Sequence, residues 1–132
     1  MIIGIGIDLV SIERIGRIYN KFPSRFLNRI FTGREKEILM KRGSPLPAMA
    51  ARFAAKEAVI KAIGCGIGPA AFKEVEVVTS TGRQPRIMLH GEALRLADEK
   101  CITEIKISMS HEPPLACAFA TAVNSAARTA AD

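Results

Sequence analysis

Residues 46–68 of the chain read LPAMAARFAAKEAVIKAIGCGIG, and this stretch decides the fold. Alanine is the strongest helix former and dominates the segment, while Pro47 suits a first helical turn and Gly64 suits a C-terminal end. At about 100° per residue, the alanines gather on one side and the larger apolar residues on another. A helix that is apolar on most sides is usually buried, so the sequence predicts a long buried helix at the centre of the protein.

Charged residues interrupt this apolar helix, and among them Lys56, Glu57 and Lys61 stand out. A buried charge is very costly unless it is paired or binds a metal. Glu57 and Lys61 lie four residues apart on one ridge, as the members of an ordinary surface ion pair do. In the alternative interpretation Glu57 holds a cation and Lys61 faces a phosphate, and the glycines after the helix allow a ligand close to the backbone. Both interpretations are open at this point.

Composition limits the class of protein. A chain of 132 residues with 48% hydrophobic and 24% charged residues is typical of one globular domain, which we place over residues 1–132. The net charge of +6 favours a negatively charged partner. Aromatic residues make up only 5% of the chain, and this argues against binding of single-stranded nucleic acid by base stacking. Residues 125–132 have little to bury and are expected to be frayed.

The three cysteines are far apart and form no C-x-x-C pair, which argues against a zinc site and against a disulfide framework. We interpret them as reduced thiols of a cytoplasmic protein. Asp8 interrupts the apolar N-terminus before a signal-peptide core is complete. No segment reaches the roughly 18 apolar residues that a membrane span needs.

Residues 1–10 are predicted to form a strand with two different faces. The isoleucines and Leu9 alternate onto one face, and Gly4, Gly6 and Asp8 share the other. Two glycines leave the second face with little side-chain bulk, so another element can pack there. A dinucleotide-binding glycine motif is excluded because Leu9 stands where the third glycine should be.

Segment 12–30 carries an apolar stripe and a separate basic stripe, both at helical spacing. Ser11 can cap this helix and Pro23 breaks it. Tyr19 and Phe22 are assigned to the core, and apolar contact with a partner at the rim of the basic surface is the alternative for both. The basic residues of the segment are Arg14, Arg17, Lys21, Arg25 and Arg29. Because the charge is of one sign only, we interpret the basic stripe as a surface for an anionic partner rather than as a solvated face.

The rest of the chain adds shorter elements. They are a helix that a capping box at Thr32–Glu35 opens, a hairpin over 74–90 with its turn at 82–85, a helix over 91–100, and strands over 104–110 and 116–123. In the helix over 91–100, Leu94 and Ala97 are predicted to face inward. His90 is given only a structural role at a strand end. Together the elements predict an α+β fold in which a mainly antiparallel sheet packs on the long central helix.

Two motifs resemble those of the bacterial holo-[acyl-carrier-protein] synthases, a family of 4′-phosphopantetheinyl transferases. The first motif is GIGIDLVSIERI at residues 4–15, and the second is RFAAKEAVIKAIG at residues 52–64. Phe31-Thr32, Gly91-Glu-Ala and Ser108-Met-Ser-His also fall in the expected order. The resemblance covers nearly the whole chain and implies the fold of 4′-phosphopantetheinyl transferases.

The resemblance also implies a function. Enzymes of this family transfer 4′-phosphopantetheine from coenzyme A to a serine of apo acyl carrier protein, which supports fatty acid biosynthesis and leaves adenosine 3′,5′-bisphosphate. The resemblance further implies a Mg²⁺ cofactor, a cytoplasmic homotrimer and active sites between adjacent subunits. A transferase for the carrier domains of other pathways is the nearest alternative. A nucleic-acid-binding protein is the second, and it gives no role to the two acids at positions 8 and 57.

The family's functional residues map onto this sequence by motif. The metal ligands are Asp8 and Glu57, which suit Mg²⁺ because this ion takes one or two carboxylates and keeps waters and phosphates. The catalytic residues are Glu57, Lys61 and His111. The coenzyme A residues are Arg52, Lys61, Gly64, Pro85, Ser110 and His111. The carrier-protein residues are Arg14, Arg17, Lys21 and Arg25, which we expect to lie away from the metal.

Three points stay open in this mapping. The general base is a metal-associated water, Glu57 or His111, and His111 is equally well read as a polar residue at a strand end. The family's Gly-Lys-Pro turn is here Gly82-Arg-Gln-Pro85, one residue longer, which affects the contacts expected with adenine. Ile60 stands where many members carry a small residue or serine, so a hydroxyl contact there is lost.

Overall fold

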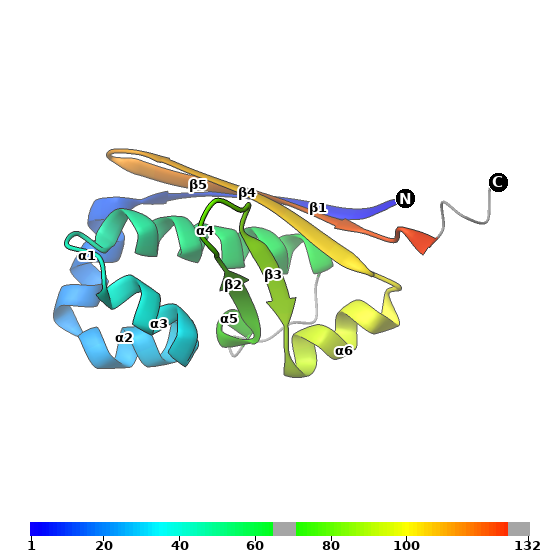
Figure 1. Cartoon of the computed structure of the whole chain (residues 1–132), viewed down its shortest axis with the longest axis horizontal. Coiled ribbons are helices and arrows are strands. Elements are labelled where there is room, and N and C mark those ends of the chain that lie inside the picture. Colours follow the sequence, from blue (N-terminus) through cyan, green and yellow to red (C-terminus); the bar gives the residue numbers. More distant parts are fainter. Residues whose placement is uncertain (65–70, 127–132) are drawn as a thin grey trace.

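The computed structural model describes residues 1–64 and 71–126 of the chain (Figure 1). Its elements in chain order are β1 (Ile2–Ser11), α1 (Ile12–Lys21), α2 (Pro23–Ile30), α3 (Gly33–Met40), α4 (Leu46–Ile63), α5 (Ala71–Glu74), β2 (Val75–Val78), β3 (Arg86–Leu89), α6 (Gly91–Glu99), β4 (Glu104–Glu112) and β5 (Leu115–Val123). None of the described helices is long and apolar enough to cross a bilayer.

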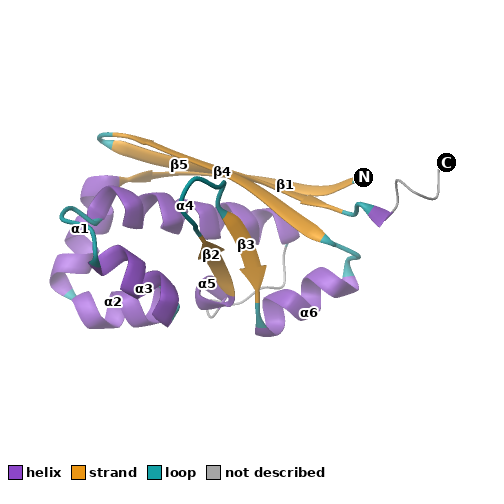
Figure 2. Ribbon diagram, viewed as in Figure 1, coloured by secondary structure: helices purple, strands orange, loops and turns teal. Residues whose placement is uncertain are grey.

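All strand pairs are antiparallel, but the strands form two sheets rather than one. The larger sheet has the order β1-β5-β4, and β2 pairs with β3 in a separate hairpin. Figure 2 shows α4 running along the larger sheet, with the β2–β3 hairpin drawn in front of the helix and α6 below it. The predicted α+β fold around a long central helix is therefore confirmed, with its strands in two sheets, and β3 contacts β4 without pairing with it.

The glycine face of β1 packs directly on α4. A Cβ atom added to Gly4 would overlap the carbonyl oxygen of Ala62, and one added to Gly6 would overlap that of Ala58. Both alanines are buried. This contact, which we call the glycine–alanine seam, confirms that another element packs on the bare face of the first strand. It brings Asp8, the next residue on the same face, onto α4.

The helix termini use the predicted signals. The Ser11 hydroxyl accepts a hydrogen bond from the Arg14 N–H at 3.2 Å and caps α1. Thr32 and Glu35 form the predicted capping box of α3. Pro23 ends the first helix and also begins α2, since proline is tolerated in a first turn. Gly64 ends α4 with a φ of 106°, which favours glycine.

The prediction that Leu94 faces inward is wrong. The inward residues of α6 are Ala93 and Ala97, which are 0% and 1% exposed, whereas Leu94 is 43% exposed. The Glu74 carboxylate accepts hydrogen bonds from the N–H groups of Glu92 and Ala93, and this fixes the rotation of the helix about its axis. Small residues then allow α6 to approach the core closely.

Lys56 belongs to the core and not to the site. Its side chain and that of Glu35 are fully buried, and Nζ donates to Glu35 Oε1 at 2.8 Å. It also donates to the carbonyl oxygens of Phe72 and Val75 at 2.8 and 2.5 Å. Burial lowers the pKa of Lys56, and the charge of Glu35 opposes this shift. Of the charged residues on α4, Arg52, Glu57 and Lys61 are left for chemistry.

Two predictions fall outside the described part of the chain. They concern the glycines after Gly64, at positions 66 and 68, and the frayed tail, of which 127–132 is not described. Cys65 lies there too. Cys101 and Cys117 are free thiols.

Candidate active site

Asp8 and Glu57, which are 49 positions apart in the sequence, line one cavity. The cavity has a volume of about 300 Å³ and lies between β1, α1 and α4. Its other walls include the apolar side chains of Ile15 and Phe53. Asp8 reaches this position because the glycine–alanine seam lays β1 on α4, one turn of helix away from the Glu57 side chain. The two predicted metal ligands are thus brought together.

The surroundings of Glu57 raise the free energy of its charged form. Burial is the main cause that raises the pKa of Glu57, the negative charge of Asp8 adds to it, and the positive charge of Lys61 opposes it. Such a pair of acids is stabilised by a cation between or beside them. The site therefore favours a positively charged ligand.

Lys61 supplies one such charge, but its partner differs from the predicted one. Its Nζ donates to Asp8 Oδ1 at 3.1 Å and to the Ile7 carbonyl oxygen at 3.0 Å, and it makes no ion pair with Glu57. The surface-pair interpretation of Glu57 and Lys61 is therefore wrong. The side chain of Lys61 remains 51% exposed, so a phosphate can reach its ammonium group.

The donor set fits magnesium better than zinc. Two carboxylates with open space beside them match an ion that keeps several water or phosphate ligands. Within residues 1–64 and 71–126, no group of three or more His, Cys, Asp or Glu side chains is placed to hold a metal. A closed structural site of the zinc type needs four protein ligands, which this cavity does not offer.

A second cluster lies beside β4. Arg52, Ser110 and His111 line a cavity of about 200 Å³. The guanidinium of Arg52 donates to the Ala48 carbonyl oxygen and to Thr79 Oγ1, both at 3.4 Å. Burial is the main cause that lowers the pKa of Arg52. Three of the predicted coenzyme A residues therefore share one surface.

This cluster contains a residue that the sequence reasoning missed. Arg42 lines the same cavity and adds a second positive charge, which also lowers the pKa of Arg52. The available signal was weak: a basic residue in the loop that precedes the central helix. Which loop residue faces β4 depends on the tertiary arrangement.

Pro85 lies near the same side of the molecule. With Arg86 and Lys106 it lines a cavity of about 290 Å³ between β3 and β4. The longer turn over 82–85 thus still brings Pro85 to a cavity with basic side chains. Its contacts with adenine stay a prediction.

The predicted coenzyme A residues do not form one site within one chain. Lys61 and Gly64 lie at the end of α4 next to β1, whereas Arg52, Ser110 and His111 lie beside β4. β5 separates these two strands, and since neighbouring strands are about 4.8 Å apart, their backbones are roughly 10 Å apart. On α4, Arg52 and Glu57 point about 140° apart around the axis.

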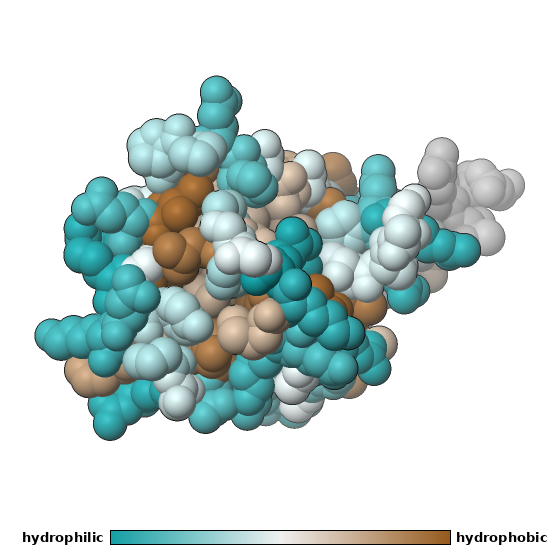
Figure 3. Space-filling view, turned by 60° about the vertical axis from the view of Figure 1, so that its left-hand side comes forward, coloured by the Kyte–Doolittle hydropathy of each residue, from teal (hydrophilic) through white to brown (hydrophobic). Residues whose placement is uncertain are grey.

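The basic stripe lies on the face that carries α1 and α2, where hydrophilic side chains surround small apolar patches (Figure 3). Arg17 pairs with Glu13 at 2.9 Å. Lys21 and Arg25 lie over the ring of Phe22, 5.6 and 5.3 Å from its centroid. Phe22 is 46% exposed, so its assignment to the core is wrong, because the corner between α1 and α2 turns it outward.

Arg14 also differs from its predicted position. It is exposed, but it lines the cavity that contains Asp8 and Glu57. The reason is that the Ser11 cap starts α1 directly after β1, so the first turn of the helix stands over Asp8. Arg14 therefore lies close to the predicted metal ligands, contrary to the expectation for the carrier-protein residues. Arg17, Lys21 and Arg25 do not line this cavity. Tyr19 packs on Phe26, as expected for the core.

The comparisons with known proteins agree on one family. Residues 4–119 match the family model of the 4′-phosphopantetheinyl transferase superfamily. The chain is 46% identical over 120 residues to the holo-[acyl-carrier-protein] synthase of Natranaerobius thermophilus. The matched region covers 91% of this chain and 96% of that protein.

Two solved structures show the same likeness in three dimensions. The structure of holo-[acyl-carrier-protein] synthase from Neisseria meningitidis is 38% identical with a TM-score of 0.83, and the match covers 93% of this chain and 99% of that one. The structure of the Helicobacter pylori synthase in complex with coenzyme A is 32% identical with a TM-score of 0.76, covering 90% and 99%.

Proposed function

The chain belongs to the 4′-phosphopantetheinyl transferase superfamily, and from that membership we propose that it transfers 4′-phosphopantetheine from coenzyme A to a serine of apo acyl carrier protein. The products are holo acyl carrier protein and adenosine 3′,5′-bisphosphate, and the reaction supports fatty acid biosynthesis. The observation that carries the proposal is the cavity that joins Asp8 and Glu57, with Lys61 beside them. We assign the enzyme to the cytoplasm, where its free thiols would stay reduced.

We further propose that Asp8 and Glu57 hold Mg²⁺. When bound, this ion would neutralise charge on the pyrophosphate of coenzyme A. The serine oxygen forms a bond to the phosphorus that carries pantetheine, and the bond from this phosphorus to the bisphosphate oxygen breaks. Lys61 is placed to stabilise the negative charge that develops on the departing bisphosphate.

The serine must also lose a proton. Of the two side chains predicted as the base, Glu57 lies in the cavity, and burial and Asp8 raise its pKa in the direction that suits a proton acceptor. His111 lies on β4, which β5 separates from β1, so we propose that it acts at the carboxylates only from a neighbouring copy of the chain.

The direct experiment is a transfer assay. Incubation with coenzyme A, Mg²⁺ and an apo carrier protein should increase the carrier's mass by one phosphopantetheine, and a chelator should stop the reaction. Carrier proteins of fatty acid synthesis and carrier domains of other pathways, compared side by side, separate the proposal from its nearest alternative. Absence of any mass gain with all carriers would contradict the transferase.

Two further observations support the proposal of a trimer. The predicted coenzyme A residues divide between two edges of the molecule. In addition, the outer face of the larger sheet exposes large apolar side chains, namely Ile5, Ile7, Leu9, Leu115 and Phe119. An exposed apolar patch on a folded protein marks an interaction surface. We propose that copies of the chain pack through this face, which brings the β4 cluster of one copy to the carboxylates of the next.

Replacing Ile5 with lysine should dissociate the assembly. The native protein is expected to have three times the mass of the chain by light scattering, and the variant that of a monomer, because a charge cannot be buried in the apolar contact. Transfer should fall with it, since each site is then incomplete. Met40→Lys, at an exposed apolar position away from the sheet, is the matched control. A native monomer with full activity would rule out the trimer.

Reversing the charges of Lys21 and Arg25 to glutamate should raise KM for the carrier protein about tenfold or more at low salt. The family's carrier proteins are acidic, and complementary charge speeds and orients their encounter. KM for coenzyme A should not change. The carrier effect should shrink as salt rises, because exposed charges are screened within about 10 Å at 0.1 M. Arg14 is left intact because it lines the metal cavity.

The matched control reverses the charges of Lys36 on α3 and of Lys41, the residue that follows this helix, which changes the net charge equally. If carrier KM stays the same in the Lys21/Arg25 variant, the stripe is only a solvated face. If the stripe bound nucleic acid, the variant would lose polyanion binding instead and show no carrier dependence.

A further inference from the structure

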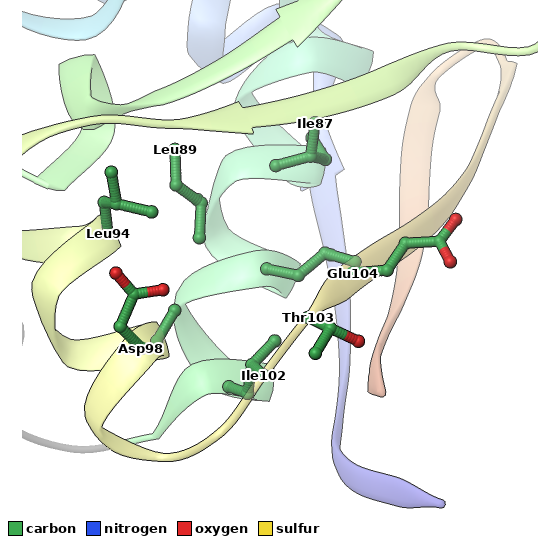
Figure 4. Close-up of a pocket in the computed structure, with 9 residues that line it drawn as sticks. Ile87, Leu89, Leu94, Asp98, Ile102, Thr103 and Glu104 are labelled. Atoms are coloured by element: carbon green, nitrogen blue, oxygen red, sulfur yellow. The ribbon is translucent and has the colours of Figure 1, made fainter. Parts of the chain in front are cut away.

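A cavity of about 400 Å³ lies outside the candidate active site, between β3, α6 and the start of β4 (Figure 4). None of the residues predicted for catalysis, metal, coenzyme A or carrier protein lines it. Six of its nine lining residues are apolar, namely Ile87, Leu89, Leu94, Ala97, Ile102 and Ile105, and polar atoms contribute about half of the lining surface. Its volume falls within the range of about 300–1,000 Å³ that small-molecule sites have.

One carboxylate, that of Asp98, gives this cavity a negative charge. Figure 4 shows the carboxylate of Asp98 directed toward the space beside Leu94 and Leu89. Throughout residues 1–64 and 71–126, no cationic side chain lies within ion-pair distance of it. Glu104 differs, because its side chain points to the far side of β4 and pairs with Lys106 at 3.5 Å. The cavity thus has one unpaired negative charge at an apolar wall.

The negative charge of Asp98 disfavours binding of the transferase's own substrates in this cavity. Coenzyme A carries several phosphates, and the carrier proteins of the family are acidic, so Asp98 repels both. The rest of the protein has an excess of positive charge, with a net value of +6, and is suited to anions. A ligand of this cavity must be of a different class.

We propose that the cavity binds a small molecule with an apolar body and one cationic end, of the alkylammonium type. The apolar body contacts the leucine and isoleucine side chains, and the ammonium group lies at the Asp98 carboxylate. Leu94 is a large apolar residue left 43% exposed on α6, and the ligand would cover it. The site is independent of the proposed transferase activity.

The site adjoins another functional region. The cavity shares Ile87, Thr103, Glu104 and Ile105 with the one that Pro85 lines. A ligand would therefore lie against the same strands that carry a predicted coenzyme A residue.

The experiment titrates the native protein with three probes of equal chain length, without coenzyme A, and follows the ¹³C-methyl signals of its isoleucines and leucines by NMR. The probes are n-octylamine, n-octanol and octanoate, all below their aggregation limits. Octylamine should shift the cavity methyl groups and bind about three- to fivefold more tightly than octanol at low salt, as an exposed ion pair provides. Octanoate should bind most weakly.

Two variants test the mechanism. Asp98→Asn should make octylamine and octanol bind equally, and Leu94→Arg should abolish binding of both. Met88→Arg is the matched control, because Met88 has the same exposure, 44%, and points away from the cavity on β3. Absence of shifts at the cavity with all three probes, or equal binding by the Leu94→Arg variant, would overturn the site. A preference for octanol or octanoate would overturn its cationic selectivity.

Discussion

Glu57→Gln is expected to lower the rate of phosphopantetheine transfer by at least about 100-fold, the loss typical when one preorganised charge-stabilising group is removed. A neutral amide is a poor ligand for Mg²⁺, which prefers charged oxygen donors. The fold should survive the change, because burial and the charge of Asp8 already disfavour the ionised form of Glu57 and raise its pKa. Loss of activity without loss of stability is therefore the expected pattern.

Two measurements check this expectation. Transfer rates are followed by the mass of the carrier protein, and binding of Mg²⁺ or Mn²⁺ is followed by calorimetry in the absence of both substrates. Glu37→Gln, at an exposed glutamate on α3, is the matched control and should change neither. Asp8→Asn should resemble Glu57→Gln in both assays. Near-normal transfer by either variant at low Mg²⁺ would remove that residue from the metal site.

Lys61→Ala is the second change with a large expected effect. If its ammonium group stabilises charge on the departing bisphosphate, turnover should fall by roughly two to three orders of magnitude. The free energy of unfolding should change by only about 0–1 kcal/mol, because the Lys61 side chain of the pair with Asp8 is 51% exposed and screened by solvent. The change in turnover should thus be far larger than the change in stability.

Lys61→Arg separates charge from shape. It keeps the positive charge and should recover part of the turnover, whereas Lys100→Ala, which removes a lysine that binds the Ile63 carbonyl oxygen, should leave turnover near normal. If Lys61→Ala has unchanged turnover, the residue only neutralises Asp8 in the unliganded protein.

Periodicity and helix signals were sufficient for most of the fold. The alanine-rich helix, the caps at Ser11 and Thr32, the bare face of β1 and the final antiparallel strands all depend on local spacing and backbone preference, which a sequence displays directly. The two carboxylates were predicted by motif, and the structure brings them into one cavity.

The errors concern neighbours that are distant in sequence. Spacing shows which residues share a face of an element, but not which element covers that face. Lys61 pairs with Asp8 rather than with Glu57 because β1 happens to lie along the last turns of α4. Phe22 is exposed because it occupies the corner between two short helices, and Leu94 is exposed because a carboxylate from another element sets the rotation of α6.

The glycine–alanine seam makes the distance between the two carboxylates a property of the main chain. Gly6 is two residues before Asp8, and Ala58 directly follows Glu57, so the closest contact of strand and helix lies beside both acids. One additional methyl group at Gly6 would force the strand away from α4 and carry Asp8 with it, although neither acid had changed. Any descendant of this chain that keeps Asp8 next to Glu57 must therefore also keep glycine at position 6, a residue that carries no reactive group itself.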